Sequence, residues 1–319
     1  MSVVEGVVEA GGESASRLIE RLERRMAELV SAHGPLLARY GGDTIAAGGK
    51  RLRPLLVFLA AGAPPPETDG LLRAAVAVEL VHSATLVHDD VLDRSPLRRG
   101  RPTVVAAAGR RLATATGDLL FSRAFAELAG TRSLPSVRVL SRASSELAAG
   151  ELMQRADAWT AVTVQRYLDR CRLKTAVLFR AACELGAIEG SGPVDALGGF
   201  GEQIGVAFQL LDDVLDVEGP PERTGKPRGA DLLDGTVTLP LLIARSRDPA
   251  LDALDPREVR TPDQAAAVCE RIAASGALEA ARERALRLIA GAKALLPPLP
   301  SRQRAALELV ADGVVERYS

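Results

Sequence analysis

One pentapeptide, DDVLD, occurs twice in this chain of 319 residues, at residues 89–93 and again at residues 212–216. The first copy ends the stretch AAVAVELVHSATLVHDDVLD, which is apolar nearly all round and therefore predicts a helix buried inside the protein. Two carboxylates about 4 Å apart repel by about 4 kcal/mol at an effective dielectric constant of about 20. Each cluster therefore needs cations or protons, and a site that uses both copies requires the chain to fold into one bundle.

The composition favours helices throughout. Hydrophobic residues make up 47% of the chain and aromatic residues only 3%, so strand signals are weak. The interruptions between apolar periodic segments are short turn signals rather than long linkers. We expect an all-α protein with a single domain over residues 1–319. The expected helices lie at residues 14–40, 51–63, 69–92, 109–129, 134–157, 164–185, 194–217 and 237–246, with three more segments after residue 262.

The spacing of the acidic residues predicts which of them share a helix face. Each helical residue turns by about 100°, so His82, Asp89 and Asp93 fall on one stripe, with Asp90 beside it. In the second copy the first and last aspartates lie one turn apart, and Gln209 lies one turn earlier. Both copies therefore present carboxylates together on one side of a helix.

Magnesium is the cation that such clusters suit. It takes oxygen ligands, keeps some of its water, and is commonly shared between one or two carboxylates and substrate phosphates. The alternative is that each cluster is a solvated acidic helix end. Two identical copies that each end an apolar helix disfavour this alternative, because unpaired charges are rarely left beside buried surface. The predicted metal ligands are Asp89, Asp90, Asp93, Asp212, Asp213 and Asp216.

Basic residues near the clusters suggest an anionic ligand. Arg98 and Arg99 follow a proline and precede Gly100, so a fixed turn would display two guanidinium groups suited to phosphate. Arginine pairs are common on surfaces, so this signal alone is weak. A second basic group, Lys50, Arg51 and Arg53, lies at a Gly-rich turn that enters a helix, a favourable place for an anion.

Histidines and isolated lysines carry weaker signals. His82 lies on the aspartate stripe two turns deeper than the cluster, and we expect it to contact phosphate, whereas His88 reads as a core or capping residue. Lys174 with Thr175, and Lys226 in TGKPRG, would be called solvated residues without further context.

The overall charge and the cysteines exclude several classes of protein. Forty basic residues against forty-one acidic ones give a net charge of −1, which argues against nucleic acid as a partner. Three cysteines without close pairs suggest neither a disulfide framework nor a zinc site, and read as buried apolar residues. The N-terminus lacks a signal sequence, and no uncharged apolar segment reaches the roughly 20 residues that cross a bilayer. We expect a cytoplasmic protein without a transmembrane segment.

Six blocks of sequence, spread over most of the chain, carry a family resemblance. They are GGKRLRP (48–54), HSATLVHDDVLDRSPLRRGRPT (82–103), GDLLFSRA (117–124), LKTAVLF (173–179), FQLLDDVLD (208–216) and GKPRGADLLDGTVTLP (225–240). In content and order they resemble the trans-isoprenyl diphosphate synthases of the polyprenyl synthetase family. The resemblance implies a bundle of antiparallel helices around a central cavity, a homodimer, and prenyltransferase activity.

The resemblance also implies roles for individual residues. The six aspartates would hold more than one magnesium ion on the diphosphate of an allylic substrate such as geranyl or farnesyl diphosphate. Contacts to that diphosphate are implied for Arg98, Lys174, Thr175, Gln209 and Lys226. Contacts to isopentenyl diphosphate are implied for Lys50, Arg53, His82 and Arg99. The departing diphosphate would be stabilised electrostatically, the isopentenyl double bond would attack the allylic cation, and a proton would then be lost.

Product length is expected to depend on Ala84 and Thr85, just ahead of the first cluster. Bulky aromatic residues at these positions limit the product in the family, so this chain resembles makers of medium- or long-chain products. Two departures from the family pattern are Thr236, where many relatives have lysine, and Val105, where many have histidine. The first would remove one contact to the allylic diphosphate, and the second has no interpretation.

Four alternatives to a medium- or long-chain synthase stay open, one of which is a purely structural helical bundle, disfavoured by the buried acidic helix ends. The chain could be a short-chain synthase that makes farnesyl or geranylgeranyl diphosphate. It could be a partner subunit of a heteromeric prenyltransferase, although such subunits generally lose one aspartate cluster. A class I terpene cyclase is disfavoured, because those enzymes usually carry a different second metal motif and an aromatic-rich cavity.

Overall fold

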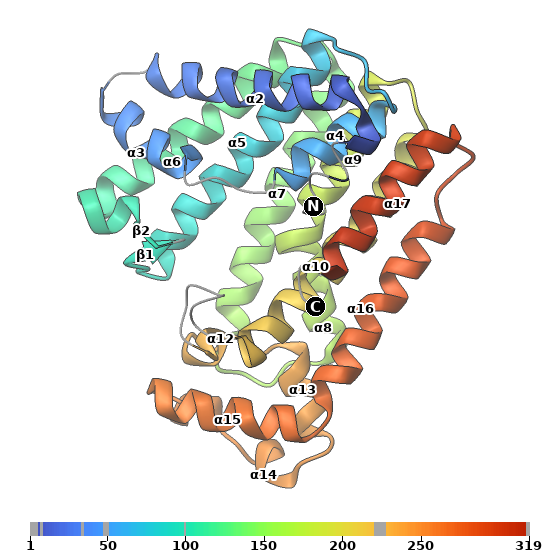
Figure 1. Ribbon diagram of the computed structural model, residues 1–319. Helices are drawn as coiled ribbons and strands as arrows, with labels where there is room; N and C mark the ends of the chain where they lie inside the picture. The colour runs from blue at the N-terminus through green and yellow to red at the C-terminus, as the bar shows by residue number, and fades with distance from the viewer. Residues whose placement is uncertain are drawn as a thin grey trace. The chain divides into compact units, whose positions relative to one another are not determined.

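The computed structural model describes residues 6, 9–32, 35–46, 51–98, 100–219 and 228–316. Within these ranges the protein is almost entirely helical (Figure 1). The only strands among the described residues are β1 (Leu97–Arg98) and β2 (Arg101–Pro102), which pair antiparallel. The predicted all-α fold class is confirmed.

The chain divides into two compact units. The first unit comprises Met1–Ser144, Leu178–Gly201 and Leu295–Gly313, and the second comprises Ser145–Val177, Glu202–Ala294 and Val314–Ser319. Four of the described helices contain boundaries between the units: α7 (Leu134–Asp157), α9 (Val177–Glu189), α10 (Val194–Glu218) and α17 (Ser301–Glu316). The expectation of a single domain over residues 1–319 stays a prediction.

Helix α5 (Asp69–Leu92) forms the core of the first unit. It packs along α6 (Val104–Ala129) and also contacts α4 (Leu52–Ala61) and α2 (Glu13–Ser31) (Figure 1). Apart from Arg73, all its residues from 71 to 81 are buried. Burial of each Leu or Val side chain contributes about 1.5–3 kcal/mol, so this surface fixes the helix in place. The helix begins at Thr68, whose hydroxyl accepts a hydrogen bond from the backbone N–H of Leu71 at 3.2 Å.

By length and composition alone the same helix could cross a membrane, which differs from the expectation that no segment of the chain is long and apolar enough. However, 72% of its most apolar 18-residue window is buried within the protein. Core helices commonly have this combination of length, apolarity and burial.

Two expected helices differ from the structure at the N-terminal side of the first unit. The helix expected at residues 14–40 is two helices, α2 and α3 (Pro35–Ala46). A proline suits the first turn of a helix but disfavours helical backbone in the residue before it, which explains the break. Helix α6 as a whole begins at Val104, capped by the Thr103 hydroxyl, and it is two helices joined at a kink at Gly109, whose φ of 80° is non-helical. The helix expected at residues 109–129 is the second of the two, and the short helix before the kink was not expected.

The helix expected at residues 164–185 is also interrupted. It is made of α8 (Val164–Cys171), a π-helical turn η1 (Arg172–Ala176), and α9 (Val177–Glu189). A π-turn places one more residue in a turn than an α-helix does and often marks a functional site. No feature of the apolar pattern predicted it.

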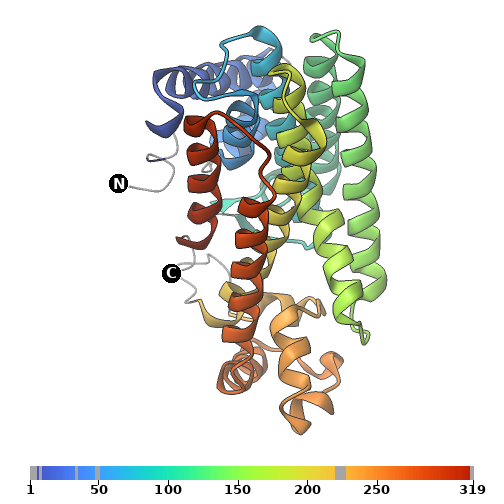
Figure 2. The same cartoon turned by 90° about the vertical axis from the view of Figure 1, so that its right-hand side faces the viewer.

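The second unit holds most of the shorter C-terminal helices. They are α12 (Ala230–Leu233), α13 (Leu239–Arg245), α14 (Pro249–Asp252), the 3₁₀ turn η2 (Pro256–Glu258), α15 (Pro262–Ala274) and α16 (Ala277–Ala294). Helices α13 and α15 contact α16, and Figure 2 shows this group in orange near the beginning of that helix. The last helix, α17 (Ser301–Glu316), completes the three segments expected after residue 262.

All three cysteines, Cys171, Cys183 and Cys269, are unpaired and buried. The prediction that they serve as small apolar core residues is confirmed. Burial raises the pKa of the Cys183 thiol above its usual value, which keeps it uncharged.

Candidate active site

The first DDVLD copy lies at the C-terminal end of α5, as predicted, and Asp93 is the residue that caps the helix. Asp89 and Asp93 are half-buried, whereas Asp90 is only 5% exposed. The Asp90 carboxylate accepts hydrogen bonds from Arg98 at 2.8 Å from Nε and 2.7 Å from Nη2. A buried carboxylate needs such a partner, and Arg98 provides it for Asp90.

Arg98 reaches Asp90 because the chain reverses direction just after α5. Arg94 has a left-handed φ of 51°, and the β1–β2 hairpin turns at Gly100, which has a φ of 74°. Arg98 lies on β1, opposite Arg101 on β2. The second arginine of the predicted pair, Arg99, lies outside the described residues.

The residues ahead of the first copy occupy the α5 turns that the sequence predicted. His82 is half-buried, and its carbonyl accepts a hydrogen bond from the Thr85 hydroxyl at 2.8 Å. Ala84 is fully buried. His88 has its Nε2 atom 3.2 Å from Asp118 and 3.3 Å from the carbonyl of Thr114, which agrees with the structural role expected for it.

The two described residues of the basic group at the start of α4, Arg51 and Arg53, make different kinds of contact. Arg51 is 9% exposed and forms ion pairs with Glu23 at 2.5 Å and with Glu79 at 2.7 Å. It therefore ties α4 to α2 and α5, and the expectation that it helps to cradle an anion is wrong. Arg53 has its guanidinium carbon 4.6 Å from the centre of the Phe179 ring, a cation–π geometry. Lys50 lies outside the described residues.

The second DDVLD copy lies near the end of α10, in the second unit. Asp213 is only 3% exposed, whereas Asp212 and Asp216 are half-buried. Asp213 accepts a hydrogen bond from the Tyr167 hydroxyl at 2.6 Å and another from the Gln209 amide at 2.7 Å. Both of these donors are neutral.

The ionisation of Asp213 follows from these surroundings. Burial raises the pKa of its carboxyl to about 8, and the negative charges of Asp231 and Asp212 act in the same direction. The hydrogen bonds from Tyr167 and Gln209 oppose this shift but do not overcome it. Asp213 is therefore protonated at neutral pH unless a cation comes close to it.

Helix α8 and the turn η1 bring further predicted residues beside the second copy. The Thr175 hydroxyl donates to the Gln209 side-chain oxygen at 2.6 Å, so Thr175, Gln209 and Asp213 form one hydrogen-bonded row. Lys174 donates from Nζ to Glu151 on α7 at 2.6 Å. The family resemblance implied that Lys174, Thr175 and Gln209 contact one diphosphate; in the structure Lys174 and Thr175 lie on η1, and Thr175 is hydrogen-bonded to Gln209.

Sequence reasoning missed two residues of this group, Tyr167 and Glu151. Tyr167 lies seven residues before Lys174, a spacing that puts both on one helical stripe, and this signal could have found it. Glu151 gives no such signal, because its contact with Lys174 comes from another helix. Two departures from the family pattern, Thr236 and Val105, are both half-buried.

The predicted donors for a metal ion are carboxylates from both copies. Within the described ranges, no group of three or more His, Cys, Asp or Glu side chains is arranged to hold a metal ion. The first copy lies in the first unit and the second copy in the second unit. That the two copies face each other stays a prediction, as do the ligand roles of the six aspartates. Lys226 lies outside the described residues.

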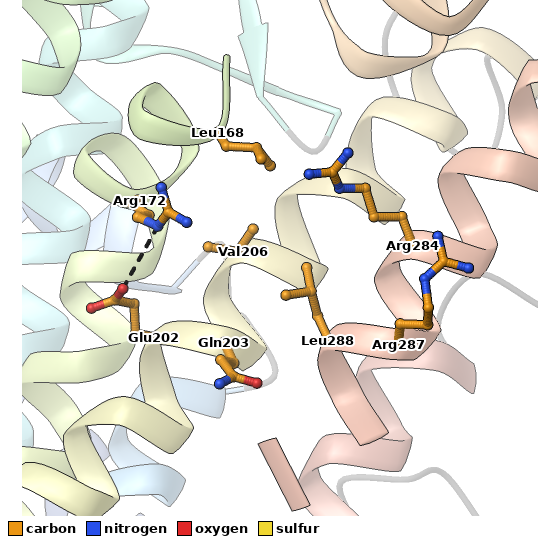
Figure 3. A pocket seen from close by; sticks show the side chains of 8 residues that line it. All are labelled: Leu168, Arg172, Glu202, Gln203, Val206, Arg284, Arg287 and Leu288. Atoms are coloured by element: carbon orange, nitrogen blue, oxygen red, sulfur yellow. Dashed lines mark ion pairs between the residues drawn. The ribbon is translucent and has the colours of Figure 1, made fainter. Parts of the chain in front are cut away.

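The second unit also contains a pocket of about 510 Å³, shown in Figure 3. Its lining residues are Leu168, Arg172, Glu202, Gln203, Val206, Arg284, Arg287 and Leu288. Arg172 forms ion pairs with Asp169 at 2.7 Å and with Glu202 at 3.8 Å. None of the residues predicted from the sequence lines this pocket, which is therefore separate from the candidate site.

Comparison with solved structures defines the class of the protein. The fold superposes on a polyprenyl synthase from Caulobacter crescentus CB15, crystallised with calcium and isoprenyl diphosphate, with a TM-score of 0.92 and 36% identity. The match covers 99% of this chain and 98% of that one. The protein is thus an all-α protein of the isoprenoid synthase type.

Sequence comparison gives the family. The family model described as polyprenyl synthetase matches residues 35–272. Heptaprenyl diphosphate synthase component 2 from Geobacillus stearothermophilus is 43% identical over 231 residues, which are 71% of each chain. Geranylgeranyl diphosphate synthase from Methanosarcina mazei is 37% identical over 281 residues, 85% of this chain and 86% of that protein. The chain belongs to the polyprenyl synthetase family, whose members are prenyltransferases.

Proposed function

We propose that this chain condenses isopentenyl diphosphate with an allylic diphosphate, geranyl or farnesyl diphosphate, and makes an all-trans polyprenyl diphosphate of medium or long chain. The observation that carries the proposal is the row of Thr175, Gln209 and Asp213, with Lys174 on the same π-turn. Together, Lys174 and this row place one ammonium group, one hydroxyl and one carboxylate cluster within the second unit. Such a group suits a diphosphate together with cations.

Magnesium fits the donors that the two copies provide. Hard oxygen ligands suit it, and the four outer aspartates, Asp89, Asp93, Asp212 and Asp216, are half-buried rather than sealed in the core. The two buried aspartates, Asp90 and Asp213, complete the predicted set of six. When bound, magnesium ions would supply charge stabilisation for the leaving diphosphate. The crystallised Caulobacter relative is complexed with calcium and isoprenyl diphosphate, which supports the use of a divalent cation by this chain.

The chain's own residues then bind and orient the substrates. Lys174 and Thr175 would contact the allylic diphosphate together with Gln209, Arg98 and Lys226. Lys50, Arg53, His82 and Arg99 would contact isopentenyl diphosphate. As the bond between the allylic carbon and the diphosphate oxygen breaks, the cationic side chains stabilise the negative charge that develops. The isopentenyl double bond forms the new carbon–carbon bond, and the proton lost afterwards passes to the released diphosphate.

One assay tests the proposal against its alternatives. The purified chain is incubated with magnesium, isopentenyl diphosphate and geranyl or farnesyl diphosphate, and the products are separated by length. Linear elongation supports the synthase. A cyclic hydrocarbon would identify a terpene cyclase, and no turnover would identify a partner subunit or a purely structural bundle.

Product length is the finer part of the proposal. Ala84 is fully buried and Thr85 half-buried on α5, one turn before Asp89. A phenylalanine at either position should block a growing chain, so Ala84→Phe and Thr85→Phe should each shorten the product by at least one isoprene unit. Ala290→Phe, at an exposed position of α16, is the matched control. An unchanged product distribution in both α5 variants would contradict the proposal.

A short-chain product is the second candidate, because the geranylgeranyl diphosphate synthase of Methanosarcina mazei matches nearly as well as the heptaprenyl relative. The length of the wild-type product decides between them. A geranylgeranyl product as the end point would replace the medium- or long-chain reading.

The assembly is proposed to be a cytoplasmic homodimer. The Geobacillus relative is named as a component, so a heteromer is the competing assembly. Light scattering of the purified chain, combined with its activity, separates the two. A dimer with full elongation activity supports the homodimer, whereas activity that requires a second protein would support the heteromer.

A further inference from the structure

The π-turn η1 lies unusually close to α7 at one residue, Gly150. This glycine is buried, and a Cβ atom placed on it would lie 2.7 Å from the backbone nitrogen of Lys174 and 2.9 Å from the carbonyl carbon of Leu173. Real Cβ atoms essentially never come within 3.0 Å of another heavy atom. Because both of these neighbours are backbone atoms, neither can move without displacing η1. Only glycine therefore permits this contact between α7 and η1.

The next residue of α7, Glu151, holds the side chain of Lys174. Its carboxylate accepts one hydrogen bond from Lys174 Nζ at 2.6 Å and another from Arg155 Nε at 2.8 Å. The side chains of Glu151 and Lys174 are 19% and 25% exposed. Burial acts to raise the pKa of the Glu151 carboxyl, but the charge and hydrogen bond of Lys174, together with Arg155, outweigh it and leave that pKa below its usual value. Glu151 is therefore an anion at neutral pH.

This geometry leaves Lys174 able to bind a second anion. An ammonium group has three donors, and Glu151 occupies one of them, so two remain for the oxygens of a diphosphate. A free lysine side chain loses about 2 kcal/mol of rotamer entropy when it is fixed in one position. Glu151 removes most of that cost in advance, because it holds the lysine before the substrate arrives.

We propose that Gly150 and Glu151 are positioning residues that together form a seat for η1: Gly150 sets the position of its backbone, and Glu151 holds the Lys174 ammonium group where the substrate diphosphate binds. The inference deepens the proposed function and rests on it. On its other side, η1 is fixed by the hydrogen bond from Thr175 to Gln209. Glu151 and Gln209 therefore hold Lys174 and Thr175, the two η1 residues that are predicted to contact the diphosphate.

The first experiment measures the kinetics of Glu151→Gln. The substitution keeps the size of the side chain and removes its charge, so kcat should fall about 10-fold while KM for isopentenyl diphosphate stays within about 2-fold. Glu146→Gln, the same change about one and a half turns earlier on α7, is the control and should leave both parameters unchanged. Equal kcat values for Glu151→Gln and Glu146→Gln would overturn the proposal.

A double-mutant cycle distinguishes positioning from a merely structural role. If Glu151 acts through Lys174, then Glu151→Gln should cost little or nothing more in a Lys174→Ala background. If Glu151 merely stabilises the fold, the 10-fold loss should recur in that background. Recurrence of the loss would overturn the proposal even though the single variant is impaired.

Gly150→Ala tests the backbone half of the seat. The new methyl group should displace η1 and lower kcat by about 10-fold or more. Gly199→Ala on α10 is the matched control, since a Cβ there meets nothing within 4 Å. Replacing glycine by alanine in a helix should by itself stabilise the protein by up to about 1 kcal/mol. A Gly150→Ala variant with the kcat of the Gly199→Ala control would contradict the seat.

A measurement independent of turnover separates failure of the seat from failure of the proposed function. Lys174 is one of four lysines in the chain, so its modification by an amine-reactive reagent can be followed by mass spectrometry. The seat predicts that Glu151→Gln speeds the labelling of Lys174 about 10-fold, with Lys293 unchanged as the internal reference. Equal labelling rates in the variant and the wild type would overturn the seat. A wild type that lacks elongation activity would overturn only the proposed function.

Discussion

The two copies of DDVLD share every letter, but their second aspartates have different partners. Asp90 is paired with the guanidinium group of Arg98, which holds a full positive charge beside it. Asp213 is equally buried but accepts hydrogen bonds from a phenol and an amide, both neutral, and burial raises the pKa of its carboxyl to about 8. The buried aspartate of the first copy therefore has a cationic partner in Arg98, whereas the hydrogen-bond donors to the buried aspartate of the second copy are neutral.

This difference teaches that a motif fixes which atoms are available but not their charge. A carboxyl is ionised or neutral according to burial and to the partners that other elements bring to it. The contrast concerns the two buried aspartates: Asp90 has the guanidinium group of Arg98 beside it, whereas burial raises the pKa of the Asp213 carboxyl.

The strongest test of the comparison is the loss of an outer aspartate from each copy. Asp89→Asn and Asp212→Asn should each lower kcat/KM by about 10³-fold, because each removes charge stabilisation from the same diphosphate. Asp195→Asn, an exposed residue in the first turn of α10, is the control and should stay near wild type. If only one of the two copies proved essential, the view that both bind one diphosphate would be wrong.

A smaller effect is expected when the built-in counter-charge of the first copy is removed. Arg98→Gln leaves the buried Asp90 without its cation and should lower the free energy of unfolding by about 3 kcal/mol. Arg101→Gln, an exposed arginine on the facing strand, is the matched control. Urea unfolding measures both, and the double variant Arg98→Gln/Asp90→Asn should recover most of the loss. If Arg98→Gln lowered the free energy of unfolding no more than Arg101→Gln does, the Arg98–Asp90 pair would contribute nothing to stability.

The corresponding change in the second copy, loss of a hydrogen-bond donor to Asp213, should lower the free energy of unfolding by less than Arg98→Gln does. Tyr167→Phe removes one neutral donor from Asp213, and because that carboxyl is protonated at neutral pH, the expected loss is about 1 kcal/mol in the free energy of unfolding. Urea unfolding at pH 7 in magnesium-free buffer makes the measurement. The same substitution in an Asp213→Asn background should cost a similar amount. A loss as large as that of Arg98→Gln would remove the contrast between the two copies.

The smallest effect is expected when a lysine is introduced at position 236, near the second copy. Thr236 lies close to the second copy. Its N–H donates to the Asp231 carbonyl, and the Asp231 N–H in turn donates to the Asp216 carboxylate. Thr236→Lys should lower KM for the allylic diphosphate about 3-fold, since the added charge favours diphosphate binding. Thr236→Met, of similar length but uncharged, is the control. An equal KM in the two variants would show that no contact is gained.

Much of the fold could be predicted from the sequence, and the failures have identifiable causes. Helix α5 was placed correctly because a long apolar run with no breaker has one stable solution, a buried helix. The break between α2 and α3 was missed although Pro35 marks it. The π-turn at Lys174 could not be foreseen, because it arises where η1 packs against Gly150, a contact between segments over 20 residues apart.

Only the family resemblance implied one site for Lys174, Thr175 and Gln209. The sequence by itself determined that this protein is helical and that carboxylates end two of its helices. These properties follow from local spacing and from residue chemistry, which need no knowledge of the neighbours in space. Only the tertiary structure decided that Arg51 is a buried structural ion-pair residue, that Glu151 holds Lys174, and that Asp90 and Asp213 have different partners. Burial and partners from distant segments set the free energy of a charge, and a linear pattern contains neither.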